Sequence, residues 1–141
     1  MLALSAAEAT FLEAHRVARL ATADARGRPH VIPICFAYDG HAVYSALDLK
    51  PKRAPVRSLR RVRNVRENPR VALVVDDYSD NWTALAYLMI EGSARLLEPG
   101  PEQREALRLL LARYEQYRAM NLSAAPVLAI EPERAVFWRA G

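Results

Sequence analysis

The sequence has 141 residues, of which 52% are hydrophobic and 26% are charged, and its formal net charge is +4. This length suits a single domain, residues 1–141, and the composition excludes an intrinsically disordered chain. A single cysteine, Cys35, excludes an internal disulfide, and no apolar run reaches the ~20 residues of a membrane-spanning helix.

The first third of the chain predicts one helix and three strands. Ser5 and Glu8 form a capping-box pattern for a helix that ends near Arg16. Pro29 and Pro33 weaken the second strand, because proline cannot donate to a strand ladder and is confined to edges and bulges. The strands are expected over residues 17–23, 28–38 and 41–46, with turns at 24–27 and 39–40.

The rest of the chain predicts two more helices and up to four more strands. Residues 47–55 contain two prolines and three basic residues and predict a loop. Helices are expected over residues 56–68 and 102–117, and strands over 71–75, 83–97, 127–130 and 135–138, with a bend or bulge near Gly92 and a turn at Glu131–Pro132. The sum is a mainly β fold of six or seven antiparallel strands with inserted helices.

Such a sheet can remove its exposed edges by closing into a barrel. The interior of a barrel of this size is filled by side chains, so a ligand must bind outside it. A site on the outer surface is poorly buried unless a second subunit covers it. We therefore expect a homodimer with a ligand at its interface.

Positive charge is concentrated in residues 50–70, which hold nine of the twenty basic residues of the chain. On a helix, Arg57, Arg60, Arg61 and Asn64 share the face opposite the valines. Guanidinium groups bind phosphate bidentately, and a loop before a helix N-terminus adds ammonium and backbone donors. The basic residues of that loop are Lys50, Lys52 and Arg53.

A solvated surface helix and a nucleic-acid site are the alternatives for this segment. A purely solubilising surface would mix its charge signs. No aromatic residue interrupts residues 50–70, and no helix-turn-helix or zinc pattern is present, so nucleic acid is not the expected partner. The three histidines stand far apart and predict no metal site, and no residue is assigned as a catalytic acid or base.

Several segments in order resemble the pyridoxamine-5′-phosphate-oxidase-like superfamily of flavin and deazaflavin split barrels. They are RVARLATADARGRPHVIP (16–33), VYSA (43–46) followed by the basic loop, RENPRV (66–71), DNW (80–82) and EGSARLL (91–97). The resemblance is closest to the branch of coenzyme F420-dependent enzymes with a Lys-Pro-Lys-Arg loop, here residues 50–53.

The resemblance implies a six- to seven-stranded FMN-binding-type split β-barrel, which forms a homodimer with two cofactor sites at the interface. It implies an oxidoreductase in which F420, or alternatively FMN, exchanges hydride with a small organic substrate. A non-catalytic cofactor- or haem-binding protein of the same fold is a further alternative. Arginines in excess of one phosphate's needs favour F420, whose phosphate is followed by several glutamates.

The resemblance also implies which residues contact the cofactor. Lys52, Arg53 and Arg61 would hold the phosphate with Lys50, Arg57 and Arg60 as neighbours, Ser45, Ala46, Thr22 and Pro33 would lie beside the cofactor, and Trp82 would approach the ring from the partner subunit. Which of Arg60, Arg61 and Arg63 makes the main phosphate contact stays open. The N-terminal residues lack the basic start and long apolar run of a secretory signal, so we expect a cytoplasmic protein.

Overall fold

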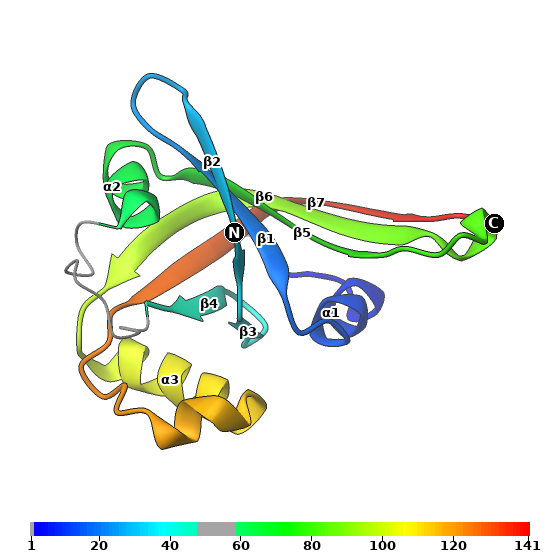
Figure 1. Ribbon diagram of the computed structural model, residues 1–141. Helices are drawn as coiled ribbons and strands as arrows, with labels where there is room; N and C mark the ends of the chain where they lie inside the picture. Colours follow the sequence, from blue (N-terminus) through cyan, green and yellow to red (C-terminus); the bar gives the residue numbers. More distant parts are fainter. Residues whose placement is uncertain (1, 48–58) are drawn as a thin grey trace.

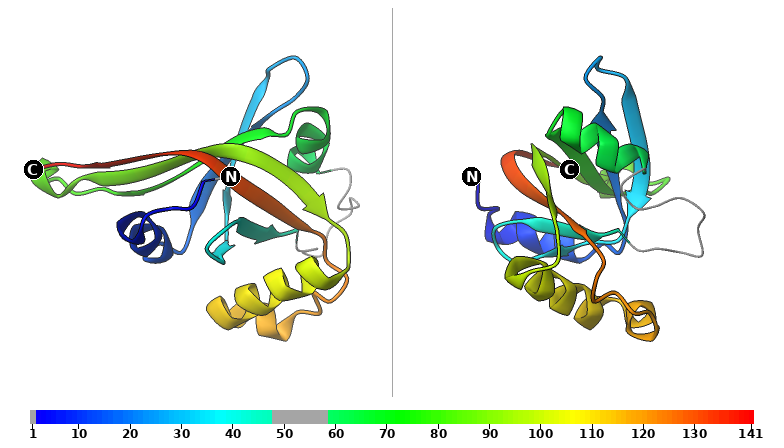
Figure 2. Two further views of the ribbon diagram at one scale, coloured as in Figure 1. Left: turned by 180° about the vertical axis from the view of Figure 1, so that it is seen from behind. Right: turned by 90° about the vertical axis from the view of Figure 1, so that its left-hand side faces the viewer.

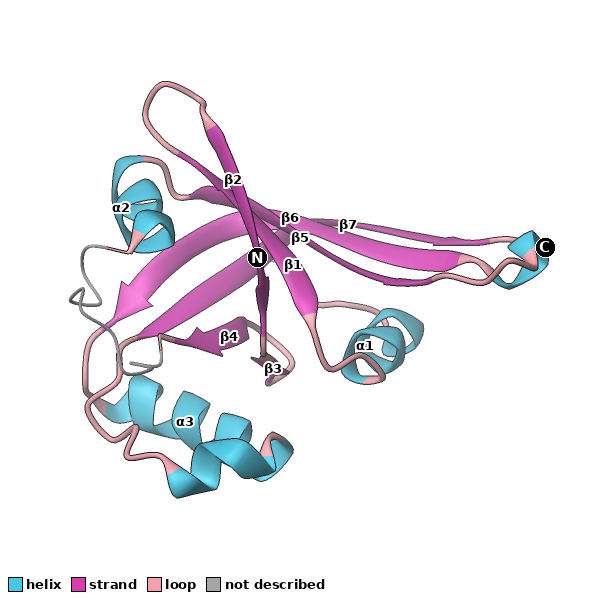
Figure 3. Cartoon of the chain, viewed as in Figure 1, coloured by secondary structure: helices cyan, strands magenta, loops and turns pink. Residues whose placement is uncertain are grey.

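The computed structural model describes residues 2–47 and 59–141 (Figure 1). Within these ranges the chain has seven strands and three α-helices and is mainly β, as the sequence predicts (Figure 3). The strands are β1 (Ala18–Ala23), β2 (Pro29–Ile34), β3 (Ala37–Tyr38), β4 (Val43–Ala46), β5 (Arg70–Asp77), β6 (Ala86–Leu97) and β7 (Val127–Arg139). The helices are α1 (Ala6–Glu13), α2 (Arg60–Glu67) and α3 (Pro101–Arg113), with the 3-10 turns η2 (Trp82–Ala84) and η3 (Glu115–Ala119).

The strands form one antiparallel sheet in the order β2-β1-β5-β6-β7-β4-β3. Its two outermost strands, β2 and β3, are consecutive in the chain, with only Cys35 and Phe36 between them. Because so short a link spans only about 10 Å, the two ends of the sheet must lie close together. The sheet therefore curls into a half-barrel, which confirms the predicted split-barrel fold (Figures 1 and 2).

The predicted strand over residues 28–38 is divided in two. Residues Pro29–Ile34 pair with β1, whereas Ala37 and Tyr38 pair with β4 at the other end of the sheet. β2 is an edge strand, and this explains how it accommodates Pro29 and Pro33, since an edge strand does not need every backbone donor.

The prediction of two separate strands at the C-terminal end was wrong. β7 is one continuous strand, Val127–Arg139, paired with β6 along its length. The expected turn at Glu131–Pro132 is instead a β-bulge, where the register with β6 shifts between Glu91 and Gly92. A proline can stay in a strand at such a point because the ladder is already interrupted there.

Gly92 makes this bulge possible, and the predicted irregularity near it is confirmed. A Cβ atom built on Gly92 would lie 2.1 Å from the backbone oxygen of Glu131 and 2.9 Å from its carbonyl carbon. Only glycine allows the two backbones to approach so closely. The curvature of the sheet at this point thus depends on one residue without a side chain.

The start of α1 and the end of α3 each have a local cause. The capping box of Ser5 and Glu8 is present at α1, as expected. The helix predicted over residues 102–117 stops at Arg113, because Tyr114 adopts an extended backbone, and continues only as the 3-10 turn η3. Within the described ranges, no helix has the length and apolar character needed to span a bilayer.

The barrel interior is filled by side chains such as Leu20, Phe36, Leu73 and Ile130, each at most 1% exposed. A second apolar cluster packs α3 and η3 against the outside of β4 and β7. Ligand sites must therefore lie on the outer surface, as the sequence predicts for a barrel of this size.

A long arm projects from the barrel (Figures 1 and 2). It consists of the β5–β6 hairpin and the C-terminal half of β7, with η2 at its tip. Its aromatic side chains are exposed: Tyr78 and Trp82 at 69%, and Trp138, which stacks on Tyr87, at 43%. Exposed aromatic residues of this kind are typical of surfaces that contact another protein.

Tyr114 joins the end of α3 to the start of β3. Its buried hydroxyl accepts a hydrogen bond from the backbone N–H of Phe36 at 3.0 Å and lies 2.9 Å from the carbonyl oxygen of the same residue. It also accepts from Nε of Arg113 at 3.1 Å. The hydroxyl thus gives a hydrogen-bond acceptor to the buried N–H of Phe36, which lies between β2 and β3.

Replacing Tyr114 with phenylalanine is expected to lower the free energy of unfolding by about 1–3 kcal/mol, because a buried N–H loses its acceptor. Urea unfolding followed by circular dichroism measures this change. Tyr78→Phe is the matched control, since its exposed hydroxyl bonds Asp80 on the arm; it should change stability by less than about 0.5 kcal/mol. Equal losses in the two variants would contradict the assigned role.

Candidate cofactor site

A hollow of about 460 Å³ lies on the outer surface between β2, β4, α2 and η3; we call it the β2–β4 hollow. It brings together four residues that the family resemblance places at the cofactor. They come from three elements: Pro33 from β2, Ser45 and Ala46 from the end of β4, and Arg61 from the first turn of α2. Its other lining residues are Ile32, Ile34, Cys35, Gln116, Tyr117 and Met120.

The chemistry of this lining suits a phosphorylated planar cofactor. The apolar side chains of β2, Ile32 to Ile34, offer a surface for a ring system. Ser45 is buried and supplies a hydroxyl, and the half-buried Arg61 supplies a guanidinium, the group that binds phosphate in a bidentate manner. The residues present therefore fit the cofactor that the fold implies.

A backbone hydrogen bond and a helix start define the positions of two of these walls. β4 ends at Ala46, and the backbone N–H of Leu47 donates to the carbonyl oxygen of Pro126, which fixes that end of the strand beside the start of β7. The chain enters α2 at Leu59, its N-cap, two residues before Arg61. The predicted contacts of Lys50, Lys52, Arg53 and Arg57 lie outside the described residues.

Residues 4–139 match the family Pyridoxamine 5'-phosphate oxidase. The chain belongs to this family. Among characterised proteins, this family member is similar to the 5a,11a-dehydrotetracycline/5a,11a-dehydrooxytetracycline reductase of Streptomyces rimosus, with 35% identity over 101 residues. That alignment covers 69% of this chain and 66% of the relative, just under two thirds of its length.

Solved structures show the same fold at lower identity. A heme binding protein from Mycobacterium smegmatis superposes with a TM-score of 0.76 at 19% identity, over 99% of this chain and 56% of that one. An FAD-binding protein from Mesorhizobium loti gives 0.72 at 23% identity, over 96% and 93%. This family member thus has the split-barrel fold of these structures, while the ligands named for the two neighbours differ from one another.

Arg60, Asn64 and Thr22, also predicted at the cofactor, are not among the residues that line the β2–β4 hollow. The Asn64 amide donates to the Thr22 hydroxyl at 3.0 Å, and its oxygen lies 3.3 Å from Nε of Arg60. Asn64 and Thr22 are both buried and join α2 to β1. The shared helix face predicted for Arg60, Arg61 and Asn64 is therefore divided, because Arg61 is about 100° around the helix from Arg60.

Arg60 lines a second, polar hollow of about 370 Å³, which we call the Asp24 hollow. Its further lining residues are Asp24, Arg28, Arg63, Asn64 and Glu67. The buried carboxylate of Asp24 accepts from the backbone N–H groups of Arg26 (2.9 Å) and Arg28 (3.0 Å) and from Nε of Arg28 (2.6 Å). These hydrogen bonds, from Arg28 above all, lower the pKa of Asp24 to about 2.

The lowered pKa of Asp24 predicts a pH-dependent stability. In the unfolded state the carboxyl has a pKa of about 3.9, so between pH 4 and pH 2 the unfolded state binds more protons and stability falls as pH falls. Wild type should be more stable than Asp24→Asn above pH 4, and the difference should shrink between pH 4 and pH 2. Urea unfolding of both proteins across this range measures it. A difference that stays constant down to pH 2 would contradict the prediction.

Trp82 lies far from the β2–β4 hollow of its own chain. It begins η2 at the tip of the arm, beside the C-terminus and at the opposite end of the molecule from α2 (Figure 1). The family resemblance implies that Trp82 lies at the cofactor of a partner subunit, and that contact stays a prediction.

Proposed function

We propose that this protein is an oxidoreductase that binds coenzyme F420 along the β2–β4 hollow and acts on a small organic substrate. The observation that carries this proposal is the meeting of Pro33, Ser45, Ala46 and Arg61 in one hollow of a flavin-binding fold. A reductase among the relatives, at 35% identity, supports a redox activity.

Each wall of the hollow has a separate task in this proposal. Arg61 makes the main phosphate contact, because neither Arg60 nor Arg63 lines this hollow. Ser45 positions the cofactor by hydrogen bonding, and the apolar surface of β2 excludes water from one side of the ring. When bound, the cofactor supplies hydride transfer at its ring.

The arrangement of arginines around α2 favours F420 over FMN. Arg61 lies in the β2–β4 hollow, whereas Arg60 and Arg63 lie in the Asp24 hollow on another side of the same helix. Two separate groups of guanidiniums suit a ligand with several anionic groups, such as a phosphate followed by glutamates. FMN ends at a single phosphate and needs only one of them.

A homodimer completes the site in this proposal. The β2–β4 hollow is open to the surface, and a second copy would cover it with the arm that carries Trp82 at its tip. The exposed aromatic residues of the arm support such a contact. Light scattering should give twice the 15.8 kDa mass of the chain.

Fluorescence titration of the purified protein with F420 and, separately, with FMN tests the proposal. We expect F420 to bind more tightly, and added salt to weaken the binding, because charges near water are screened. Oxidation of reduced F420 in the presence of an organic acceptor separates an enzyme from a storage protein. Tighter binding of FMN would overturn the choice of F420, and binding of neither would overturn the site.

A further inference from the structure

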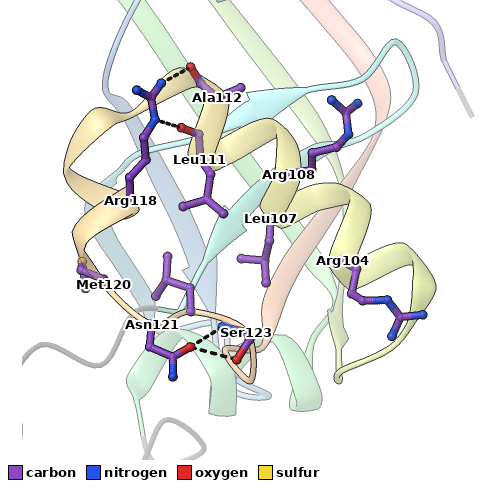
Figure 4. A pocket seen from close by; sticks show the side chains of 10 residues that line it. Arg104, Leu107, Arg108, Leu111, Ala112, Arg118, Met120, Asn121 and Ser123 are labelled. Atoms are coloured by element: carbon purple, nitrogen blue, oxygen red, sulfur yellow. Dashed lines mark hydrogen bonds between the residues drawn. The ribbon is translucent and has the colours of Figure 1, made fainter.

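A larger hollow, of about 660 Å³, lies between α3, η3 and the segment that follows η3; we call it the α3–η3 hollow (Figure 4). Its volume is within the ~300–1,000 Å³ of typical small-molecule sites. The cofactor site does not use it, although Met120 lines both hollows and marks where they adjoin. Its lining residues are Arg104, Leu107, Arg108, Leu111, Ala112, Arg118, Met120, Asn121, Leu122 and Ser123.

The floor of this hollow is apolar. Leu107 and Leu111 of α3 point toward its middle (Figure 4), and the buried Leu122, in the segment after η3, is a third lining leucine. Met120 continues this surface with a flexible, polarisable side chain that adapts to different shapes. A ligand here would bury an apolar body.

The rim of the hollow is positively charged. Arg118 and Arg104 stand at opposite ends of it (Figure 4), and within the described part of the chain neither forms an ion pair with a carboxylate. Arg108, in contrast, is neutralised by Glu105, with Nε to Oε1 at 3.0 Å. Two guanidiniums without an acidic partner beside an apolar floor attract an anion.

The walls are held in place by the protein's own hydrogen bonds. Gln103 is 1% exposed, and its amide nitrogen donates to the carbonyl oxygens of Ser123 (3.1 Å) and Ala125 (2.9 Å), which ties the outer wall to α3. Arg118 donates from Nε to the carbonyl oxygen of Leu111 at 2.9 Å. A hollow fixed without a ligand costs little ordering when one binds.

We propose that the α3–η3 hollow binds a small organic anion, an apolar aromatic body that carries one carboxylate or sulfonate group. The leucine floor takes the body and Arg104 takes the acidic group, since the guanidinium of Arg118 already donates to the carbonyl oxygens of Leu111 and Ala112. This binding is separate from the proposed function, because Arg104 and the leucines of the floor do not line the β2–β4 hollow, and Met120 is the one lining residue that the two hollows share.

Titration with the fluorescent probe 8-anilinonaphthalene-1-sulfonate tests the proposal, with N-phenyl-1-naphthylamine as the same apolar body without the sulfonate. Arg104→Glu should weaken binding of the sulfonate about fivefold, the effect of a charge near the surface, and leave the neutral probe unchanged. This variant should fold normally, since an acidic residue suits the N-terminal part of α3. Ala112→Trp, at an exposed lining position, should weaken both probes by filling the hollow.

Two charge-matched variants serve as controls. Arg26→Glu, in the exposed turn between β1 and β2, makes the same change in net charge away from the hollow, and Arg61→Glu makes it in the β2–β4 hollow. Neither should weaken the sulfonate more than about twofold. Loss of binding with Arg61→Glu, equal losses in all three charge variants, or unchanged binding of the sulfonate in either Arg104→Glu or Ala112→Trp would overturn the proposal.

Discussion

Replacing Gly92 with alanine is expected to destabilise this protein by about 3 kcal/mol, the upper part of the range for overpacked sites. The added Cβ would lie 2.1 Å from the backbone oxygen of Glu131, and backbone atoms cannot move aside as the end of a flexible side chain can. The bulge must open and the β6–β7 ladder must shift to make room. Because small domains have only ~5–15 kcal/mol of stability, urea unfolding should show a large fall in the midpoint.

Gly100→Ala is the matched control for Gly92→Ala. Gly100 has an extended backbone, and an added Cβ would meet only the oxygen of Glu98, at an ordinary 3.7 Å. Gly100 is the N-cap of α3, where alanine is disfavoured, so we expect a loss of less than about 1 kcal/mol. Similar losses at the two glycines would show that the close approach at the bulge does not determine the effect.

Reversing the charge of Arg61 is expected to have the largest effect on cofactor affinity. A hydrogen bond between charged groups is worth about 1.5–3 kcal/mol, so Arg61→Glu should raise the Kd of F420 between ~10- and ~100-fold. Arg61 alone among the described arginines lines the β2–β4 hollow beside Ser45 and Ala46. Fluorescence titration with F420 at low salt measures the change.

Arg66→Glu is the control for Arg61→Glu. Arg66 is exposed on the same helix but does not line the β2–β4 hollow, and its replacement by glutamate makes the same change in net charge. The Kd of this variant for F420 should stay within about twofold of the wild-type value, since an exposed charge is screened by salt. Equal losses in the two variants would mean that the helix acts through its overall charge, and that Arg61 makes no specific contact.

Local patterns predict most of the fold, and the errors come from long-range contacts. The capping box, the turn that begins at residue 39 and the glycine near the bulge are properties of neighbouring residues, and the structure has all three. Pro132 indicated a turn because nothing near it in sequence shows that Gly92, forty residues earlier, makes room for a bulge. The break at Cys35–Phe36 likewise follows from pairing with strands on opposite ends of the sheet.

The candidate site was predictable only in part for a similar reason. Helical periodicity correctly places the arginines of α2 on a different side from its two valines, Val62 and Val65, which are buried. It cannot show that the helix stands between two hollows, so that Arg60 and Arg61 face different ones. The α3–η3 hollow was missed because Leu107 and Leu111 have the spacing of ordinary core residues. Its outer wall depends on Gln103, whose role no sequence pattern marks.

Because β7 is one continuous strand, it connects the arm directly to the candidate cofactor site. One end of this strand pairs with β4 at Ser45 and Ala46, and the other runs beside β6 to Arg139 near the tip of the arm. A force applied to the tip is therefore carried by covalent bonds and two ladders to the wall of the candidate cofactor site that contains Ser45 and Ala46. A partner that binds the arm would therefore shift or immobilise that wall. The bulge at Gly92 is the one irregular point in the β6–β7 ladder, and it is where the strand would bend instead.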